Sequence, residues 1–342
     1  MSEFKVDTIT NRDGSHGPQV CGITTFRSSG LTLPSGPTEM RGGRGRGITG
    51  GGFVSPASQN VMDFITFAST GDAQDFGDLT VILRNIATCA SSTRGIFASG
   101  QSPSNSDVIM YTTISSSGGC NDFGNLSSVM TNSNEGCTSD NIRGLIVFGS
   151  NVPAVFQGSM EFVTIPTTGN SSSFGELSVQ RRHSASMASP TRGVFASGKN
   201  DYISTYLKII DFVIIQTQGT AVAFGEISGN GREQSVGAGN ATRGLMAGGL
   251  ESPTPYQNID FITLATEGNG QDFGDLAANR FGMSSMSSST RATFAGGSTP
   301  SNSDTIEYVT IASTGNAADF GDLTVARTVP QGLSDVHGGL TE

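Results

Sequence analysis

A Phe-Gly dipeptide recurs at a nearly constant interval along this chain of 342 residues, in six copies. Successive phenylalanines are 47, 51, 50, 49 and 47 residues apart. Self-similarity at a period of this length is typical of repeat architectures, in which each repeat is one small supersecondary unit. The phenylalanines are Phe76, Phe123, Phe174, Phe224, Phe273 and Phe320. The chain therefore divides into six units of about 49 residues, which begin near Arg41.

Other residue types keep the same step. An arginine recurs once in each unit, as Arg46, Arg94, Arg143, Arg192, Arg243 and Arg291. A glycine follows each arginine six residues later, as Gly52, Gly100, Gly149, Gly198, Gly249 and Gly297. Five units then carry an acid–aromatic pair, Asp63-Phe64, Glu161-Phe162, Asp211-Phe212, Asp260-Phe261 and Glu307-Tyr308, and the remaining unit has Met110-Tyr111.

The last complete unit contains four segments with strand character. The first starts at Phe281, the second is the small-residue run Arg291–Gly297, the third is Thr305–Ala312 and the fourth is Phe320–Arg327. The third is β-branched and alternating, which is the strongest strand signal of the unit. The polar segment between the second and third is expected to be a loop.

We therefore expect an all-β fold. Charged residues make up only 14% of the chain and Gly reaches 47, a composition that suits short strands and turns better than helices. Four strands per unit, with a glycine after the second, predict a kelch-like β-propeller. The best count is six blades, and the alternative is seven, if residues 20–45 form a divergent blade.

The two ends of the repeat array complement each other. Ala326–His337 resembles the start of a further unit, with Arg327 in the place of Arg84 or Arg280, and stops where a second strand is due. The first unit begins at its second strand, with Arg46. We therefore expect the C-terminal strand to pair with the strand near Gly45–Gly52 and to close the ring. The expected domains are an N-terminal β arm, 1–40, and a propeller, 41–342.

The repeated residues have architectural and functional interpretations. The phenylalanine suits a wedge between blades, the glycine after it a turn or bulge, and the glycine after the second strand a close backbone approach near the axis. The arginines could form a ring that binds an anion, or could bond turn carbonyls or a carboxylate, which the sequence favours. The candidate carboxylates stand two residues after the phenylalanines: Asp78, Glu176, Glu226, Asp275 and Asp322, with Asn125 in the second copy.

Other chemistry finds little support in the sequence. Asp319-Phe320-Gly321 matches the magnesium-binding D-F-G of protein kinases, and Asp319 and Asp322 could suggest a metal pair. Other units have Ser173 and Ala223 in place of the first Asp, which favours turn chemistry. The histidines, His16, His183 and His337, share no motif, so we expect no enzyme, cofactor or metal.

Charge and cysteine usage point the same way. A net charge of −10 argues against nucleic-acid binding, although Gly42–Gly47 reads G-G-R-G-R-G, which is RGG-like. No C-x-x-C occurs, so we expect small buried residues with free thiols at Cys21, Cys89, Cys120 and Cys137. An apolar signal segment and a membrane span are also not expected.

Residues 1–40 stand outside the repeat and contain two short strand-like stretches. Two strands alone are too few to be stable, so this arm must pair with the propeller or with another chain. The arm reads K-V-D-T-I-T-N-R-D-G-S, then V-C-G-I-T-T-F, then L-P-S-G-P-T-E-M-R-G-G-R-G-R-G. It resembles the N-terminal attachment segment of virion proteins from T4-like cyanophages and other marine tailed phages. The units, with T-R-G-x-F-A-S-G, I-E-Y-V-T-I-A-S-T-G-N-A and D-F-G-D-L-T, resemble the kelch-like repeats of the same proteins.

The resemblance implies a non-enzymatic virion protein of the tail, fibre, baseplate, neck or capsid surface. Its arm would bind other virion proteins, and its propeller would present loops for assembly or for recognition of a host glycan or protein. The most variable loops, and so the candidate contact segments, are Gln101–Asp107, Gly198–Tyr206, Leu250–Gln257 and Ser298–Asp304. The alternatives are a generic kelch-type interaction scaffold and, with less support, a propeller carbohydrate-binding protein or enzyme.

Overall fold

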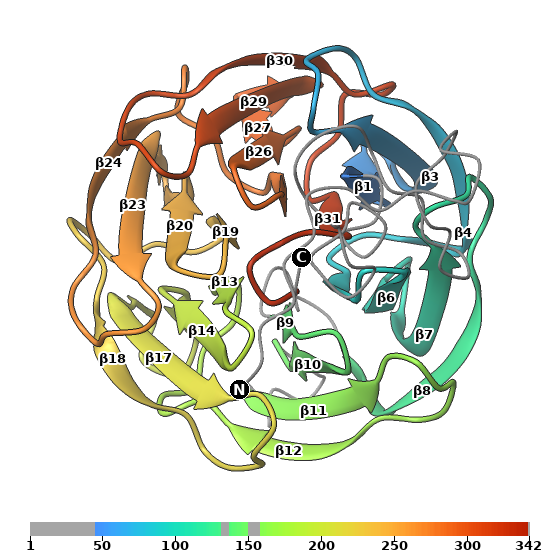
Figure 1. The fold of residues 1–342 in the computed structure, drawn as a ribbon, viewed down its shortest axis with the longest axis horizontal. Helices are drawn as coiled ribbons and strands as arrows, with labels where there is room; N and C mark the ends of the chain where they lie inside the picture. Colours follow the sequence, from blue (N-terminus) through green and yellow to red (C-terminus); the bar gives the residue numbers. More distant parts are fainter. Residues whose placement is uncertain (1–44, 131–136, 150–157, 341–342) are drawn as a thin grey trace, which may run out of the picture.

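The computed structural model describes residues 45–130, 137–149 and 158–340. These residues form a six-bladed β-propeller, in which each blade is an antiparallel sheet whose strands succeed one another from a central axis outward (Figure 1). Blade 1 has strands from both ends of the repeat array: β31 (Gln331–Ser334), β1 (Arg46–Gly50), β3 (Ala57–Thr66) and β4 (Gln74–Leu83).

Each of the other blades comes from one continuous stretch of the chain, and its four main strands follow one another from the axis outward. Blade 2 is β5 (Ala87–Ala90), β6 (Arg94–Gln101), β7 (Asn105–Thr113) and β8 (Asn121–Met130), and blade 3 is β9 (Cys137–Ser139), β10 (Arg143–Val147), β11 (Ser159–Thr164) and β12 (Ser172–Glu176). Blade 4 is β13 (Ala185–Ala188), β14 (Arg192–Ala196), β17 (Ile209–Ile214) and β18 (Val222–Glu226). Blade 5 is β19 (Val236–Gly239), β20 (Arg243–Ala247), β23 (Asn258–Thr263) and β24 (Gln271–Asp275), and blade 6 is β25 (Ser284–Ser287), β26 (Arg291–Ala295), β29 (Thr305–Thr310) and β30 (Ala318–Asp322).

The C-terminal strand pairs with the first strand and closes the ring, as the repeat predicts. Gly47 of β1 pairs with Ser334 of β31, and Gly50 pairs with Gln331. Blade 6 then lies directly against blade 1, because the backbone N–H of Gly71 donates to the carbonyl of Phe320 over 2.7 Å. The propeller therefore has six blades, and the seven-bladed alternative is wrong. The predicted arm, 1–40, lies outside the described residues.

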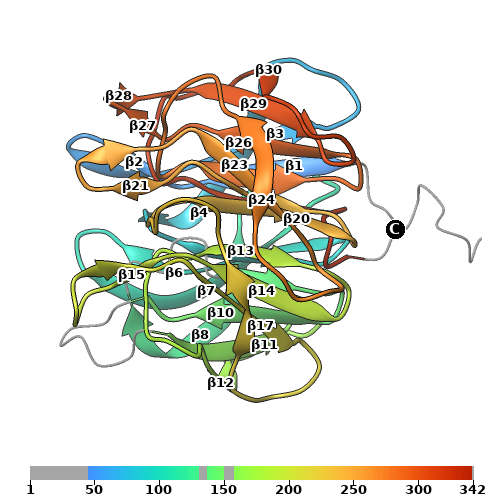
Figure 2. The same cartoon turned by 90° about the vertical axis from the view of Figure 1, so that its left-hand side faces the viewer.

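In blades 1, 4, 5 and 6 the connection between the second and third strands is a small hairpin, where the sequence predicts a loop. These hairpins use β2 (Phe53–Val54) against β3, β15 (Lys199–Asn200) against β16 (Thr205–Tyr206), β21 (Leu250–Glu251) against β22 (Thr254–Pro255), and β27 (Ser298–Thr299) against β28 (Ser301–Asn302). Figure 2 shows them on one face of the ring, opposite the C-terminus. The fourth strand of blade 6 is also shorter than expected, since β30 ends at Asp322.

The hydrophobic core lies between blades and not within them. Six apolar clusters are each shared by two neighbouring blades. The cluster at the closure joins Ile65 and Phe67 of blade 1 to Ile306 and Phe320 of blade 6. A lone four-stranded sheet could not bury both of its faces, so each blade depends on its neighbours for its core.

Candidate functional site

The repeated arginines form inter-blade bonds, which is the architectural interpretation. The guanidinium of each arginine lies 4.4–4.9 Å from the centre of the aromatic ring in the acid–aromatic pair of its own blade, or of Tyr111 in blade 2. Each Nη1 also donates to a main-chain carbonyl of the next blade; for example, Arg94 reaches Ile165 over 2.8 Å and Arg291 reaches Phe67 over 2.6 Å. Within the described residues no ion pair joins these arginines to the carboxylates that follow Phe-Gly, so that suggested pairing is wrong.

The recurring phenylalanine is the expected wedge. Phe76 and Phe320 are 1% and 2% exposed and belong to clusters that span two blades. In every blade this ring meets the aromatic ring under the arginine edge-on, with centroids 5.8–6.3 Å apart. The arginine, the aromatic ring and the phenylalanine thus form one stack per blade, with favourable geometry at both contacts.

The glycine after the phenylalanine is required by close packing as well as by conformation. The strand register skips Phe320 as a bulge, pairing Ile306 with Gly321 and Glu307 with Asp319. Gly321 has φ +148°, and a Cβ there would lie 2.4 Å from the backbone of Gly71 in the next blade. The same contact between Phe-Gly and a neighbouring turn recurs at all six interfaces. D-F-G in this chain is therefore a packing motif.

A second series of arginines, for which the repeat pattern predicted no role, is buried. Arg181, Arg232, Arg280 and Arg327 stand four residues before an inner strand and are at most 2% exposed. Each pairs with the acid of the acid–aromatic pair; Arg181 lies 3.0 Å from Asp211, Arg232 lies 2.6 Å from Asp260, and Arg280 pairs with Glu307. Burial lowers the pKa of Arg181, and the carboxylate of Asp211 opposes that shift. The signal was present in the sequence, because the four arginines also recur at the repeat interval.

Blade 2 replaces this ion pair with an apolar one. Leu83 stands four residues before β5, and Met110 pairs with Phe97 as Asp211 pairs with Phe195. Leu83 and Met110 are 1% and 0% exposed and share one cluster. Arg84, which the sequence aligned with Arg327, is one residue out of register and instead lies over the ring of Phe53 at 4.5 Å.

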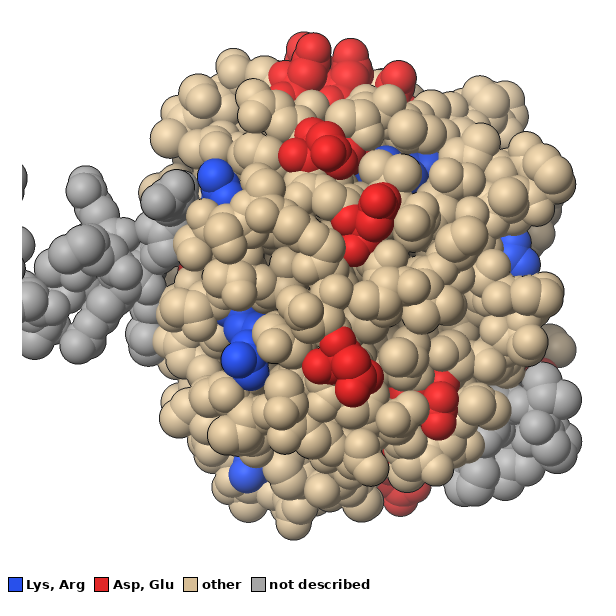
Figure 3. All heavy atoms as spheres, turned by 90° about the vertical axis from the view of Figure 1, so that its right-hand side faces the viewer, with Lys and Arg blue, Asp and Glu red and all other residues tan. Residues whose placement is uncertain are grey.

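Acidic side chains gather on the outer edge of the ring without forming a metal site. Figure 3 shows them as separate red patches on the edge. Burial and the carboxylates of Asp304, Asp72 and Asp319 raise the pKa of Asp322, which marks a crowded acidic surface. No group of three or more potential ligand residues converges within the described ranges. The two Asp of D-F-G-D are exposed residues of strand β30, and not turn residues as the sequence favoured.

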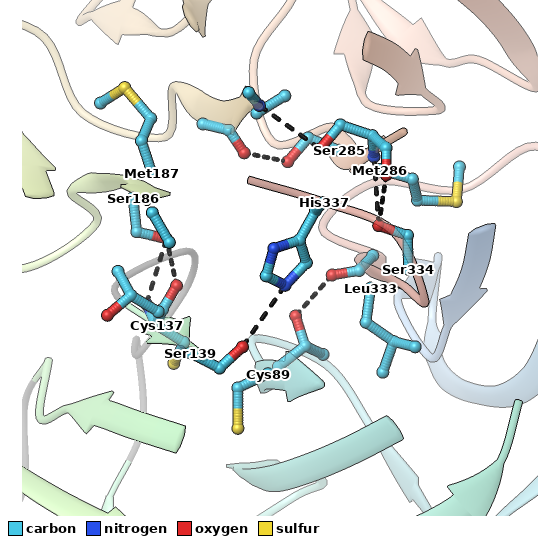
Figure 4. A pocket seen from close by; sticks show the side chains of 18 of the residues that line it. Cys89, Cys137, Ser139, Ser186, Met187, Ser285, Met286, Leu333, Ser334 and His337 are labelled. Atoms are coloured by element: carbon cyan, nitrogen blue, oxygen red, sulfur yellow. Dashed lines mark hydrogen bonds between the residues drawn. The ribbon is translucent and has the colours of Figure 1, made fainter. Parts of the chain in front are cut away.

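The axis encloses a small polar cavity of about 70 Å³. Thr88, Ser186 and Ser285 line it from alternate blades, and each hydroxyl donates to a carbonyl of the preceding blade over 2.6–2.7 Å. Cys137 lines the same cavity (Figure 4), and burial raises the pKa of its thiol to about 12. Cys89 and Cys120 are buried free thiols, as expected, whereas Cys137 is half-buried and Cys21 lies outside the described residues.

The segment after β31 closes one end of this cavity. It curls into the centre of the ring in Figure 1, and Leu340 is buried. His337 Nε2 lies 3.3 Å from Ser139 Oγ, and the N–H of Gly338 donates to the carbonyl of Gly239 over 3.1 Å. Burial lowers the pKa of His337 to about 4, so the ring is neutral at pH 7.

The four candidate loops lie on the opposite face, where they form or include the small hairpins and the β6–β7 turn. Glycines at the end of the second strand allow the chain to enter these hairpins. For example, Gly198 has φ +110°, and a Cβ at this position would lie 2.7 Å from the carbonyl of Arg182. The close approach expected for this glycine is therefore present, and it is made to the link between blades. The structure thus combines a repeated framework with one face of differing hairpins.

Comparisons with known proteins agree on the fold and go no further. No protein-family model matches the chain, and no curated protein matches it. Many solved structures match, among them the one titled "Structure of YjhT", with a TM-score of 0.61, 11% sequence identity, 75% of this chain covered and 88% of that chain covered. The chain is a six-bladed β-propeller by this likeness as well as by its own topology. In the described part of the chain, no helix is long and apolar enough to cross a membrane.

Proposed function

We propose that this chain is a non-enzymatic structural protein of a phage virion, anchored through residues 1–40 and displaying its propeller. Support comes from the resemblance of the arm and of the repeat motifs to virion proteins of T4-like cyanophages and related marine phages. On this proposal the protein is made in the host cytoplasm and carried on the particle. The partners of the arm are other virion proteins.

One structural observation carries the proposal that the propeller is a display scaffold. The polar side chains kept from unit to unit are bonded within the framework: the outer arginines to carbonyls of the next blade, and the inner arginines to buried carboxylates. What varies from unit to unit is the hairpin face. A rigid ring with one variable face suits binding to a surface, with contacts made by loops on a fixed scaffold. A host glycan or protein is the proposed ligand of that face.

Mass spectrometry of purified particles tests the proposal. We expect the full chain at a fixed ratio to the major virion proteins, and a chain that lacks residues 1–40 to fold but to be missing from particles. If the protein is made in infected cells but is absent from the purified particles, the virion assignment is wrong. That result would leave the generic kelch-type interaction scaffold as the better interpretation.

A further inference from the structure

The hairpin of blade 4 differs from the others on its face. Five blades have a described connection between their second and third strands, and four of these turn on small or proline residues: Ser55-Pro56, Ser102-Pro103-Ser104, Ser252-Pro253 and Pro300. The blade 4 turn instead contains Tyr202 and Ile203, which are 59% and 63% exposed. No other described hairpin tip on this face exposes a large hydrophobic side chain.

The tip is held in one conformation by its own polar residues. Asn200 is buried, and its Oδ1 accepts from the backbone N–H of Tyr202 over 3.0 Å and of Ile203 over 3.3 Å. The hydroxyl of Thr205 donates to the carbonyl of Ile203 over 3.0 Å. The two exposed residues are therefore positioned by side chains on both sides of the turn.

The base of the hairpin is clamped to the ring by charge. Arg182 exchanges two backbone hydrogen bonds with Lys199, each 3.0 Å long, and its Nε lies 2.8 Å from Asp201. Glu233, from the next link, accepts from His183 Nδ1 at 2.9 Å and lies 3.9 Å from Lys199 Nζ. Burial alone would raise the pKa of Glu233, but His183, Arg182 and Lys199 outweigh burial and lower it.

A further contact joins this hairpin to blade 5. The ammonium of Lys199 lies 5.1 Å from the ring centre of Tyr206, and the hydroxyl of Tyr206 accepts from the backbone N–H of Ser252 over 3.2 Å. The hairpin is thus supported at its tip, at its base and on one side, and its most exposed large side chains in the described structure are those of Tyr202 and Ile203.

We propose that the Tyr202–Ile203 tip is the anchor of a protein-binding site, whose partner offers an apolar pocket with an acidic rim. An exposed aromatic–aliphatic pair on a turn whose backbone is already held has the properties of a binding hot spot, because that backbone loses little entropy on association. Lys199 and Lys208, the only lysines among the described residues, flank the hairpin in a chain of net charge −10. Lys199 lies against Glu233 and Arg182 against Asp201, so the exposed ammonium of Lys208 supplies the excess positive charge that selects an acidic rim.

A sugar or a second copy of the chain fits this tip less well. The polar groups beside Tyr202 are already bonded, since Asn200 caps the turn and Asp201 pairs with Arg182, so no set of groups in the described hairpin converges on sugar hydroxyls. A second copy would need an apolar cavity for the tip. Three hollows of the described residues are a polar axial cavity, a polar cleft at Thr266–Gln271 and an inter-blade gap of about 10 Å³, and none of these three is an apolar cavity large enough for the tip.

A random cyclic-peptide library selected on the purified full chain tests the inference, which does not depend on the particle that carries the protein. We expect selected peptides to be rich in apolar and acidic residues. Their affinity should fall about tenfold or more for the double variant Tyr202→Ser/Ile203→Ser and stay unchanged for Ile142→Ser. Ile142 is a matched control, because it is 56% exposed and lies on the turn between β9 and β10. If the selected peptides bind the Tyr202→Ser/Ile203→Ser variant as tightly as the Ile142→Ser control, the proposal is wrong.

Two further measurements separate an anchor from a merely sticky tip. Asn200→Ala keeps both exposed side chains but removes the cap, so we expect weaker binding, and we expect Asn200→Asp to restore it because a carboxylate also accepts both N–H groups. If the wild type, Asn200→Ala and Asn200→Asp bind the peptides equally well, the cap by Asn200 does not preorganise the tip for binding. Sedimentation velocity provides the last check: a wild-type dimer that the double variant converts to monomer would show that a second copy occupies the tip, and would overturn the proposed partner.

Discussion

Arg327 and Asp63 form a buried ion pair, with 2.9 Å between Nη1 and Oδ2, and join the link between β30 and β31 to the first blade. Both side chains are fully buried. A second contact accompanies the pair, since Asp335 Oδ1 accepts from the backbone N–H of Arg46 over 2.8 Å. In blades 2 to 6 a side chain in the turn before the arginine makes this same bond. Blade 1 thus keeps the contacts of the other blades, although Asp335 and Arg46 come from opposite ends of the repeat array.

Opening the latch should therefore be costly. Arg327→Ala leaves Asp63 buried without its charge partner, and we expect a loss of about 3–5 kcal/mol in the free energy of unfolding. Deletion of residues 327–342 removes β31 as well and should lower the melting temperature further. Urea unfolding with Arg84→Ala as the control measures this, since Arg84 stacks on Phe53 at a half-buried site and should cost about 1 kcal/mol or less. If deletion of residues 327–342 leaves the melting temperature unchanged, the C-terminal strand does not hold the ring closed.

Blade 2 suggests how an ion pair can be replaced. Because Leu83 and Met110 fill the positions of Arg181 and Asp211, we expect the double variant Arg181→Leu/Asp211→Met to fold with a stability within about 1 kcal/mol of the wild type. Asp211→Met alone should cost about 3–5 kcal/mol, because Arg181 stays buried and unpaired. A double-mutant cycle by thermal unfolding checks the coupling. Additive losses would mean that the two solutions are not interchangeable.

The sequence predicted architecture better than pairings. Period, strand count and closure follow from spacing alone, and Arg46 and Arg327 place both ends in register. The partner of each outer arginine was missed because it is a main-chain carbonyl of the next blade, such as Ile114 for Arg46, and carbonyls leave no trace in a residue pattern. The sequence aligned Arg84 with the buried arginines Arg280 and Arg327. The equivalent residue of blade 2 is Leu83, one position earlier. Exposure of Tyr202 depends on the tertiary position of a hairpin, so only the structure could single it out.

A comparison of Gly321 with Gly71 separates the cost of a steric clash from the cost of backbone strain. Gly321 and Gly71 have similar φ values, +148° and +153°, but a Cβ at Gly321 would lie 2.4 Å from the backbone of Gly71, whereas nothing lies within 4 Å of a Cβ at Gly71. Gly71→Ala should cost only conformational strain, about 1–2 kcal/mol. Gly321→Ala should cost clearly more, because blade 6 must move away from blade 1. Equal losses in urea unfolding would rule out the packing role.

The C-terminal segment should protect the axial cysteine. A Cβ on Gly339 would lie 1.7 Å from the carbonyl oxygen of Ser139, so Gly339→Ala should displace the segment from the channel. Water would then reach Cys137, whose pKa falls as its burial is relieved, and a thiol reagent at pH 8 should label it about tenfold faster or more. The measurement uses a Cys21→Ser/Cys89→Ser background, because Cys89 also lines the cavity, and Gly71→Ala at the outer edge is the control. Equal labelling rates would contradict a closing role for this segment.

Acid should loosen the same segment through His337. The Nδ1 of His337 accepts from the N–H of Gly339 over 3.1 Å, which requires a neutral ring. The folded-state pKa of about 4 lies below the unfolded value of 6.5, so the unfolded state binds more protons between them and stability falls as the pH drops from 6.5 to 4. The full effect is on the order of 3 kcal/mol. His337→Gln keeps an acceptor that cannot titrate, so the melting temperature of the wild type should fall more steeply than that of the variant across this window. His183 titrates in both proteins and cancels in the comparison, so parallel pH profiles would show that His337 does not govern the acid response.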